Sequence, residues 1–207
     1  MIRLSEDPMN TSHGMPQGKL IVVSAPSGAG KTTIVKAILK KYPSMLFSIS
    51  AATRARRETE VDGKDYYFLS RQEFERRIQA GELVEWEEIY GNLYGTLKQE
   101  VNKALSSGKV MLFDIDAKGG LSIKRTYPRD SVLIFIKPPS IDILETRLRG
   151  RKTEDDTTFK RRMDRVAMEL GMASQFDFQV VNDDLQSAIA EVDKLVLAHT
   201  TSAQRAS

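Results

Sequence analysis

The sequence contains no cysteine and only two histidines, and it has no long apolar run. Without cysteine the chain cannot form disulfides or thiolate metal sites, so we expect a cytoplasmic protein. No stretch is apolar enough to cross a membrane, and the N-terminus lacks the apolar segment of a secretory signal. We assign no role to His13 or His199, because both lie in terminal segments.

A strong excess of one charge is also missing, since 31 lysines and arginines face 28 acids for a net charge of +3. Arginines nevertheless cluster at 54–57, 147–151 and 161–165, which favours anionic ligands contacted at a few points. These clusters lack interleaved aromatics, so we expect no nucleic-acid partner. The length of 207 residues predicts one domain over 18–207, after a disordered tail at 1–17.

What the chain does have is the layout of a phosphate-binding loop. Residues 20–23 form a short run rich in β-branched side chains, typical of a strand buried on both faces. Residues 24–30 are small and rich in glycine, and Lys31 opens a segment with apolar residues at helical spacing. Backbone N–H groups of such a loop, together with the following helix N-terminus, can surround phosphate oxygens.

The residues at the end of this loop fit a bound nucleoside triphosphate. Lys31 can bridge the β- and γ-phosphates, and the Thr32 hydroxyl can bind Mg²⁺. The pattern is G-x-x-x-x-G-K-[ST], with Ala25 in place of its first glycine. The alternative is an incidental glycine-rich turn before a helix.

Strands and helices alternate along most of the chain, which predicts an α/β fold with a doubly wound, mostly parallel sheet. Further strands are expected over 45–50, 66–69, 83–90, 110–116, 131–136 and 178–182. Residues 91–95 are rich in turn formers and predict a link, while Ser70 and Thr96 each begin a capping-box pattern. Residues 51–96 break the alternation, which indicates an inserted lobe between core segments 18–50 and 97–207.

Acidic and basic side chains supply further candidates for chemistry. Asp114 and Asp116 end an apolar strand, where an acid could face Mg²⁺ held by Thr32. The alternative, that they only cap a turn, is disfavoured by the phosphate loop in the same chain. Arginines flank the polar segment around residue 152, so residues 147–165 could form a lid over a transferring phosphoryl group. The alternative for these arginines is ordinary solvated surface.

Glu85 lies in an apolar context, where a carboxylate is costly unless it is paired. It could bind a nearby cation, or a ligand that presents adjacent N–H donors. Tyr66 and Tyr94 could belong to the same site or be core aromatics with satisfied hydroxyls.

A series of short motifs occurs along the chain in a specific order and spacing. They are SAPSGAGKTT at 24–33, T-R-x-x-R-x-x-E-V-x-G-x-x-Y-x-F at 53–68, E-W at 85–86, G-N-x-Y-G-T at 91–96, D-I-D at 114–116, P-P-S at 138–140, R-L-x-G-R at 147–151 and V-N-D-D at 181–184. On these motifs the chain resembles the guanylate kinase family from about Gly18 to His199.

The resemblance implies a P-loop kinase that uses ATP and Mg²⁺ to phosphorylate GMP, and also dGMP, to GDP in purine metabolism. It makes residues 51–96 the GMP-binding lobe and residues 147–165 the lid. It assigns guanine recognition to Ser50, Glu85, Thr96 and Asp116. It assigns the GMP phosphate to Arg54, Arg57, Tyr66 and Tyr94.

The resemblance also implies the donor site and the catalytic groups. ATP binding falls to Ser27, Gly28, Ala29, Gly30, Lys31, Thr32 and Thr33, with Asn182 near the adenine and Asp183 beside it. The metal would be held by Thr32 and Asp114. The catalytic cations would be Lys31, Arg57, Arg147, Arg151 and Arg162. A carboxylate such as Glu85 can accept from both guanine N1–H and the 2-amino group, so an enzyme of this kind should reject AMP.

The chain departs from the family pattern at Arg56, Glu58 and Thr59 in the arginine loop, and at Lys152 in the lid. Two other functions compete with the enzyme. A non-catalytic guanylate-kinase-like binding module would lack phosphate-loop and lid residues, which are present here. A P-loop kinase with another acceptor is disfavoured by Glu85, Ser50 and Asp116. The sequence does not decide whether the chain forms a homo-oligomer.

Overall fold

The computed structural model of the chain describes residues 18–89, 91–149 and 156–204, except the side chains of 156–158 and 201–204. The tail expected at 1–17 therefore lies outside the described residues. So do Arg151 and Lys152, together with the rest of the segment 150–155 of the expected lid.

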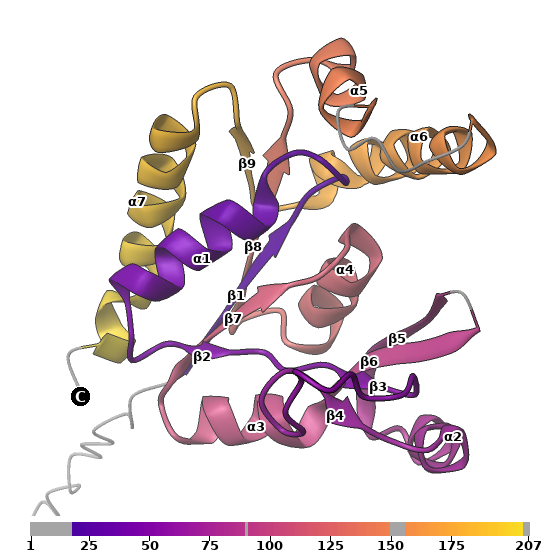
Figure 1. Ribbon diagram of the computed structural model, residues 1–207. Coiled ribbons are helices and arrows are strands. Elements are labelled where there is room, and N and C mark those ends of the chain that lie inside the picture. The colour runs from indigo at the N-terminus through magenta and orange to yellow at the C-terminus, as the bar shows by residue number, and fades with distance from the viewer. Residues whose placement is uncertain (1–17, 90, 150–155, 205–207) are drawn as a thin grey trace, which may run out of the picture.

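The larger of two sheets is entirely parallel, with strand order β2-β7-β1-β8-β9 (Figure 1). Its strands are β1 (Lys19–Ser24), β2 (Leu46–Phe47), β7 (Val110–Asp114), β8 (Ser131–Lys137) and β9 (Phe178–Val181). The central strand β1 is buried on both faces, because its run of β-branched residues has helices packed above and below. The predicted α/β class with a mostly parallel sheet is confirmed.

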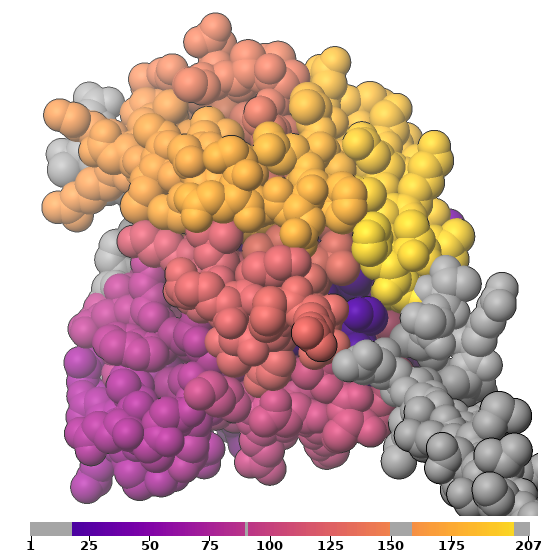
Figure 2. All heavy atoms as spheres, turned by 180° about the vertical axis from the view of Figure 1, so that it is seen from behind, coloured from indigo at the N-terminus to yellow at the C-terminus, as the bar shows by residue number. Residues whose placement is uncertain are grey.

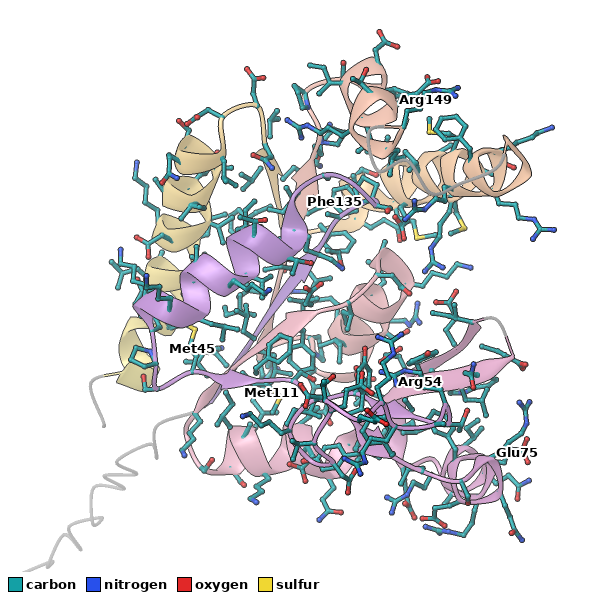
Figure 3. All side chains as sticks on the ribbon, in the orientation of Figure 1. Met45, Arg54, Glu75, Met111, Phe135 and Arg149 are labelled. Atoms are coloured by element: carbon teal, nitrogen blue, oxygen red, sulfur yellow. The ribbon has the colours of Figure 1, made fainter. Side chains whose placement is uncertain are left out.

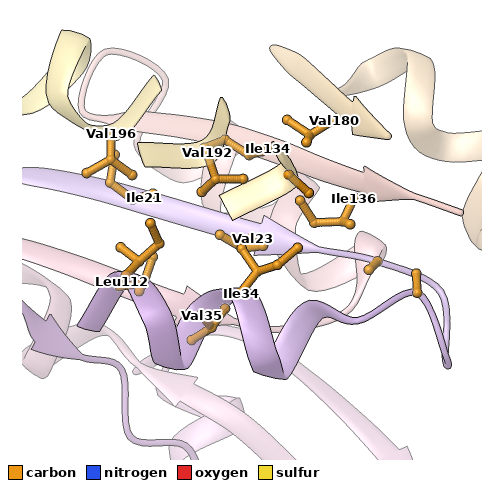
Figure 4. Close-up of a cluster of buried hydrophobic side chains, with 14 of the residues drawn as sticks. Ile21, Val23, Ile34, Val35, Leu112, Ile134, Ile136, Val180, Val192 and Val196 are labelled. Carbon is orange, nitrogen blue, oxygen red and sulfur yellow. The ribbon is translucent and has the colours of Figure 1, made fainter. Parts of the chain in front are cut away.

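Helices cover both faces of this sheet. On one face, Val23 and Ile134 pack against Ile34 of α1 (Lys31–Lys41) and Val192 of α7 (Leu185–Gln204), as Figure 4 shows. On the other face lie α3 (Lys98–Ser106) and α4 (Ala117–Thr126). Beyond β8 the chain forms α5 (Ile141–Arg149), α6 (Asp156–Met172) and a short 3₁₀ turn at Ala173–Gln175. None of the helices in the described part of the chain is long and apolar enough to span a bilayer.

The smaller sheet has the order β4-β3-β6-β5 and is built from segments between residues 51 and 97. Its elements are β3 (Ala51–Ala52), β4 (Tyr67–Phe68), α2 (Arg71–Gln79), β5 (Leu83–Ile89) and β6 (Asn92–Leu97). Phe74 of α2 is fully buried under it, with Leu93 and Leu97 beside it. Seen from behind, α4 lies between this sheet and α6 (Figure 2), and it contacts both β5 and α6.

Several local predictions are wrong in this region. The turn-rich link expected at 91–95 is largely strand β6, because antiparallel pairing with β5 outweighs the weak strand propensity of Asn92 and Gly95. The strand expected over 45–50 is only Leu46–Phe47, and the chain then crosses to the smaller sheet at β3. Likewise, the strand expected over 110–116 ends at Asp114.

The two capping predictions have different outcomes. Ser70 caps α2 as predicted, with its hydroxyl accepting from Glu73 N at 3.1 Å. The capping box at Thr96 is wrong, because Leu97 occupies the cap position of α3 and makes no side-chain cap. The Thr96 hydroxyl is instead bonded to Glu85. A buried carboxylate without a donor is costly, so the hydroxyl donates to Glu85 instead of capping the helix.

Candidate active site

The loop between β1 and α1 is shaped by two glycines with left-handed backbones. Gly28 has φ 88° and Gly30 has φ 93°, conformations that other residues rarely adopt. A Cβ at Gly30 would also collide with the side-chain amide of Asn182. That amide is buried and donates to the Ala29 carbonyl at 2.7 Å, so Asn182 supports the loop from behind.

A second support comes from β1 itself. Ser24 is fully buried, and its hydroxyl lies 2.9 Å from the Ile115 carbonyl and 3.0 Å from the Asp116 carbonyl. These bonds join the start of the loop to the chain that follows β7. The loop backbone is thus fixed on both sides, with the N-terminus of α1 directly after it.

Lys31, Thr32 and Asp114 meet at the mouth of this loop. Lys31 Nζ lies 2.8 Å from Asp114 Oδ1 and 2.8 Å from the Ile115 carbonyl, and Thr32 Oγ1 lies 3.4 Å from Asp114 Oδ2. They line a cavity of about 370 Å³, called the loop cavity here. Its other lining residues are Ala25, Pro26, Ser27, Gly28, Gly30, Thr33, Asp116, Arg165 and Glu169.

The Thr32 hydroxyl and the Asp114 carboxylate are hard oxygen donors that fit Mg²⁺. In proteins this ion usually takes one or two such ligands and completes its shell with substrate phosphates and water. Among the described residues there is no cluster of three or more histidines and acids that could hold a metal without such help. The residues present therefore suit a metal shared with a bound phosphate chain.

A second cavity, of about 450 Å³, lies between the smaller sheet and α4. It is lined by Ile78, Leu83, Val84, Glu85, Trp86, Glu87, Asp116, Lys118, Gly119 and Ser122, and is called the acidic cavity here. Glu85 Oε1 accepts from the Thr96 hydroxyl at 2.6 Å. Burial, with smaller contributions from Asp116 and Glu87, raises the pKa of Glu85 to about 7.

Asp116 lines both cavities. Its Oδ1 accepts from Gly119 N at 2.8 Å and caps α4, and its Oδ2 lies 3.2 Å from Arg165 Nη2. The same Arg165 nitrogen lies 3.2 Å from Glu87 Oε2, and Arg165 Nε lies 3.2 Å from Glu169 Oε1. One guanidinium therefore joins three carboxylates where the two cavities meet.

The smaller sheet holds a separate cluster around Arg54 (Figure 3). Both terminal nitrogens of Arg54 contact the Glu60 carboxylate, at 2.5 and 2.7 Å, and the guanidinium lies 4.7 Å from the centre of the Tyr66 ring. The Tyr66 and Tyr94 rings are 6.2 Å apart. Hydrogen bonds from Arg54 and from the backbone of Arg57 lower the pKa of Glu60 to about 2.

The remaining candidates lie around these groups. The side chain of Arg57 is exposed, and half-buried Ser50 accepts from Tyr67 N through its carbonyl. On the loop side, Arg147 Nη2 lies 3.5 Å from the Asn182 carbonyl and Arg162 Nη2 lies 3.4 Å from Ser27 Oγ. Asp183 is exposed beyond Asn182.

Glu87 and Glu169 were not predicted as site residues from the sequence, and Arg165 was predicted only as one of a cluster of arginines. Weak signals for all three were present. Glu85 and Glu87 alternate on β5, so they share a face. Arg165 and Glu169 stand four apart, the spacing of a helical ion pair.

Comparison with known proteins agrees with this architecture. The family model "Guanylate kinase" matches residues 17–199. A guanylate kinase from Salinibacter ruber is 50% identical over 86% of this chain and 94% of its own length, and one from Chlorobium luteolum is 47% identical over 84% and 89%. The crystal structure of guanylate kinase from Anaplasma phagocytophilum has a TM-score of 0.68 and 28% identity, covering 90% of this chain and 88% of that one. The chain belongs to the guanylate kinase family.

Proposed function

We propose that this protein phosphorylates GMP, and also dGMP, to the diphosphate with ATP as donor, in the purine metabolism of the cytoplasm. The observation that carries the proposal is the meeting of two cavities at Asp116, one with a phosphate loop and one with a buried carboxylate. Family membership supports the same reaction. Residues 51–96 act as the GMP-binding lobe and residues 147–165 as the lid.

On the donor side, the backbone N–H groups of residues 27–33 bind the phosphates of ATP. Lys31, whose Nζ lies 2.8 Å from Asp114 Oδ1, binds the β- and γ-phosphates of ATP. Asp114 and Thr32 would hold Mg²⁺, which would neutralise phosphate charge. Asn182 keeps the loop in shape through Ala29.

On the acceptor side, Glu85 selects the base. Its ionised carboxylate accepts from guanine N1–H and the 2-amino group, and Thr96 holds it in place at 2.6 Å. Adenine offers no such pair of donors, so AMP would leave a buried carboxylate unpaired. Ser50 and Asp116 complete base recognition.

The phosphate of GMP binds at Arg54, Arg57, Tyr66 and Tyr94. Glu60 already occupies the fork of Arg54, so it fixes the guanidinium plane against Tyr66 before GMP arrives. The exposed Arg57 is free to move toward the incoming phosphate. In this proposal Arg54 is therefore a fixed cation, and Arg57 is a cation that moves toward the phosphate.

Transfer requires positioning and positive charge rather than a base. A GMP phosphate oxygen attacks the γ-phosphorus, the bond to the β–γ bridging oxygen breaks, and ADP leaves with that oxygen. Lys31, Arg147, Arg151 and Arg162 stabilise the charge on the transferring group. The attacking oxygen is already anionic, so no proton has to be removed.

The proposal is tested by a coupled assay of ADP formation with ATP, Mg²⁺ and one acceptor at a time. GMP and dGMP should be phosphorylated, and AMP and UMP should be at least about a thousandfold poorer in kcat/KM. Product analysis must show GDP from GMP. Absence of GDP would favour the non-catalytic binding module, whereas rapid turnover of UMP or AMP would favour a kinase with another acceptor.

A further inference from the structure

Helix α6 contacts both nucleotide cavities through two arginines one turn apart. Arg162 Nη2 lies 3.4 Å from Ser27 Oγ in the phosphate loop. Arg165 Nη2 lies 3.2 Å from Glu87 Oε2 on β5 and 3.2 Å from Asp116 Oδ2 at the start of α4. The same helix therefore contacts the loop that binds the donor and the strand that carries Glu85.

The orientation of the Arg165 guanidinium is fixed by a residue of the same helix. Glu169 follows four residues later, its side chain is only 6% exposed, and its Oε1 lies 3.2 Å from Arg165 Nε. A carboxylate that deeply buried needs a partner, which fixes Nε on the α6 side. The Nη2 end of the guanidinium then contacts Glu87 and Asp116, which lie outside α6.

The two carboxylates at that end belong to different parts of the molecule. Asp116 caps α4 next to the larger sheet, whereas Glu87 lies on β5 of the smaller sheet. Arg165 neutralises both, and each carboxylate oxygen still has lone pairs for a nucleotide donor. Among the residues that the structure describes, Glu87 is the one that joins Arg165 to the smaller sheet.

We propose that Arg165 is a positioning residue that couples the two nucleotide sites through Glu87. This inference rests on the proposed function. ATP bound at the loop fixes α6 through Arg162, and α6 then fixes β5 through Arg165 and Glu87, with Glu85 two residues away facing GMP. Each nucleotide tightens the binding of the other by the same factor, because binding coupling is reciprocal.

The test is calorimetry of GMP binding with and without the β,γ-imido analogue of ATP and Mg²⁺. For the unaltered protein we expect GMP to bind roughly five- to twentyfold more tightly with the analogue present. Glu87→Gln should reduce that ratio to within about twofold of one, because the neutral side chain no longer forms an ion pair with Arg165. Glu88→Gln is the matched control on the opposite face of β5, where Glu88 pairs with Arg71 inside the smaller sheet.

A second pair of variants keeps the test independent of folding. Arg165→Gln alone would leave buried Glu169 unpaired, so it is made together with Glu169→Gln. In that background Glu87→Gln should have no further effect on coupling. Coupling that survives Glu87→Gln, or that is missing from the unaltered protein while GDP formation is normal, overturns this inference and leaves the proposed function standing. Failure to form GDP at all overturns the proposed function instead.

Discussion

The larger and smaller sheets of this protein are stabilised in different ways. In the larger sheet, β1 and β8 are almost wholly buried, and parallel pairing is surrounded by packed helices. In the smaller sheet, β3 and β4 have two residues each, and three of the seven residues of β5 are glutamates. Apolar packing therefore forms the sheet that carries the proposed donor loop, whereas polar contacts position side chains of the sheet that carries the proposed acceptor site.

The same contrast holds for the functional groups. The proposed donor loop presents its backbone, which is fixed by Gly28, Gly30 and the buried amide of Asn182. The proposed acceptor side presents side-chain pairs, such as Glu85 with Thr96 and Arg54 with Glu60. Changes on the donor side should therefore impair turnover or ATP binding, and changes on the acceptor side should impair GMP binding or selectivity.

The largest expected effect is the loss of turnover in Lys31→Ala. Lys31 is the loop's cation for the transferring phosphate, so kcat should fall by roughly a thousandfold. Its pair with Asp114 is partly exposed, so the melting temperature should change little. Lys36→Ala, an exposed position on the same helix, is the control and should keep full activity. A Lys31→Ala enzyme with near-normal kcat would contradict the donor-site assignment.

The next largest effect should be on the acceptor side, in Glu85→Gln. A glutamine retains the shape but cannot accept from two guanine donors at once, so kcat/KM for GMP should fall by about a hundredfold. Turnover of AMP should change far less, which narrows the preference for GMP. Steady-state kinetics with both acceptors measure this. If the ratio of kcat/KM for GMP to kcat/KM for AMP were unchanged, Glu85 would not be the residue that selects the base.

Sequence patterns predicted the larger sheet well for a physical reason. Runs such as residues 131–136 are apolar on both faces, and that pattern depends only on the strand itself. The phosphate loop was predictable as well, because its glycines and Lys31 follow a local rule of backbone geometry. Both features are specified by residues that are neighbours in sequence.

The smaller sheet was harder to predict because its residues are specified by distant partners. Thr96 has the sequence spacing of a helix cap, but its hydroxyl donates a hydrogen bond to Glu85, eleven residues earlier in the chain. Asn92 and Gly95 suggest a turn, yet pairing with β5 makes them strand. The Arg165 contacts cross 49 and 78 residues, and no local pattern encodes them.

An effect of about tenfold is expected from pH on the acceptor side. The pKa of Glu85 is raised to about 7, mainly by burial, so the carboxyl is mostly protonated at pH 6 and mostly ionised at pH 8. GMP needs the ionised form, so KM for GMP should fall about tenfold between these values. The GMP phosphate also ionises near pH 6, so Glu85→Gln is the control. Its KM for GMP should show no change centred near pH 7.

The same group gives a stability prediction with a defined sign. Because the folded pKa of Glu85 lies above its ordinary value of 4.5, ionisation is easier in the unfolded chain. Its contribution to stability is therefore fully present below about pH 4.5 and is lost as pH rises to about 7. Chemical denaturation at pH 5 and pH 8 should reveal this loss in the unaltered protein and not in Glu85→Gln. If the free energy of unfolding changed equally between pH 5 and pH 8 in the two proteins, the raised pKa of Glu85 would be contradicted.

The smallest expected effects separate the two sides most cleanly. Thr96→Val removes the hydroxyl that bonds to Glu85, so KM for GMP should rise about fivefold and stability should fall by about 1 kcal/mol. Asn182→Ala removes the amide under Ala29, so KM for ATP should rise instead. Each KM is measured with the other nucleotide saturating, which keeps coupling between the sites out of the comparison. If Thr96→Val raised KM for ATP as much as that for GMP, the side-chain pairs of the smaller sheet would not be specific to the acceptor.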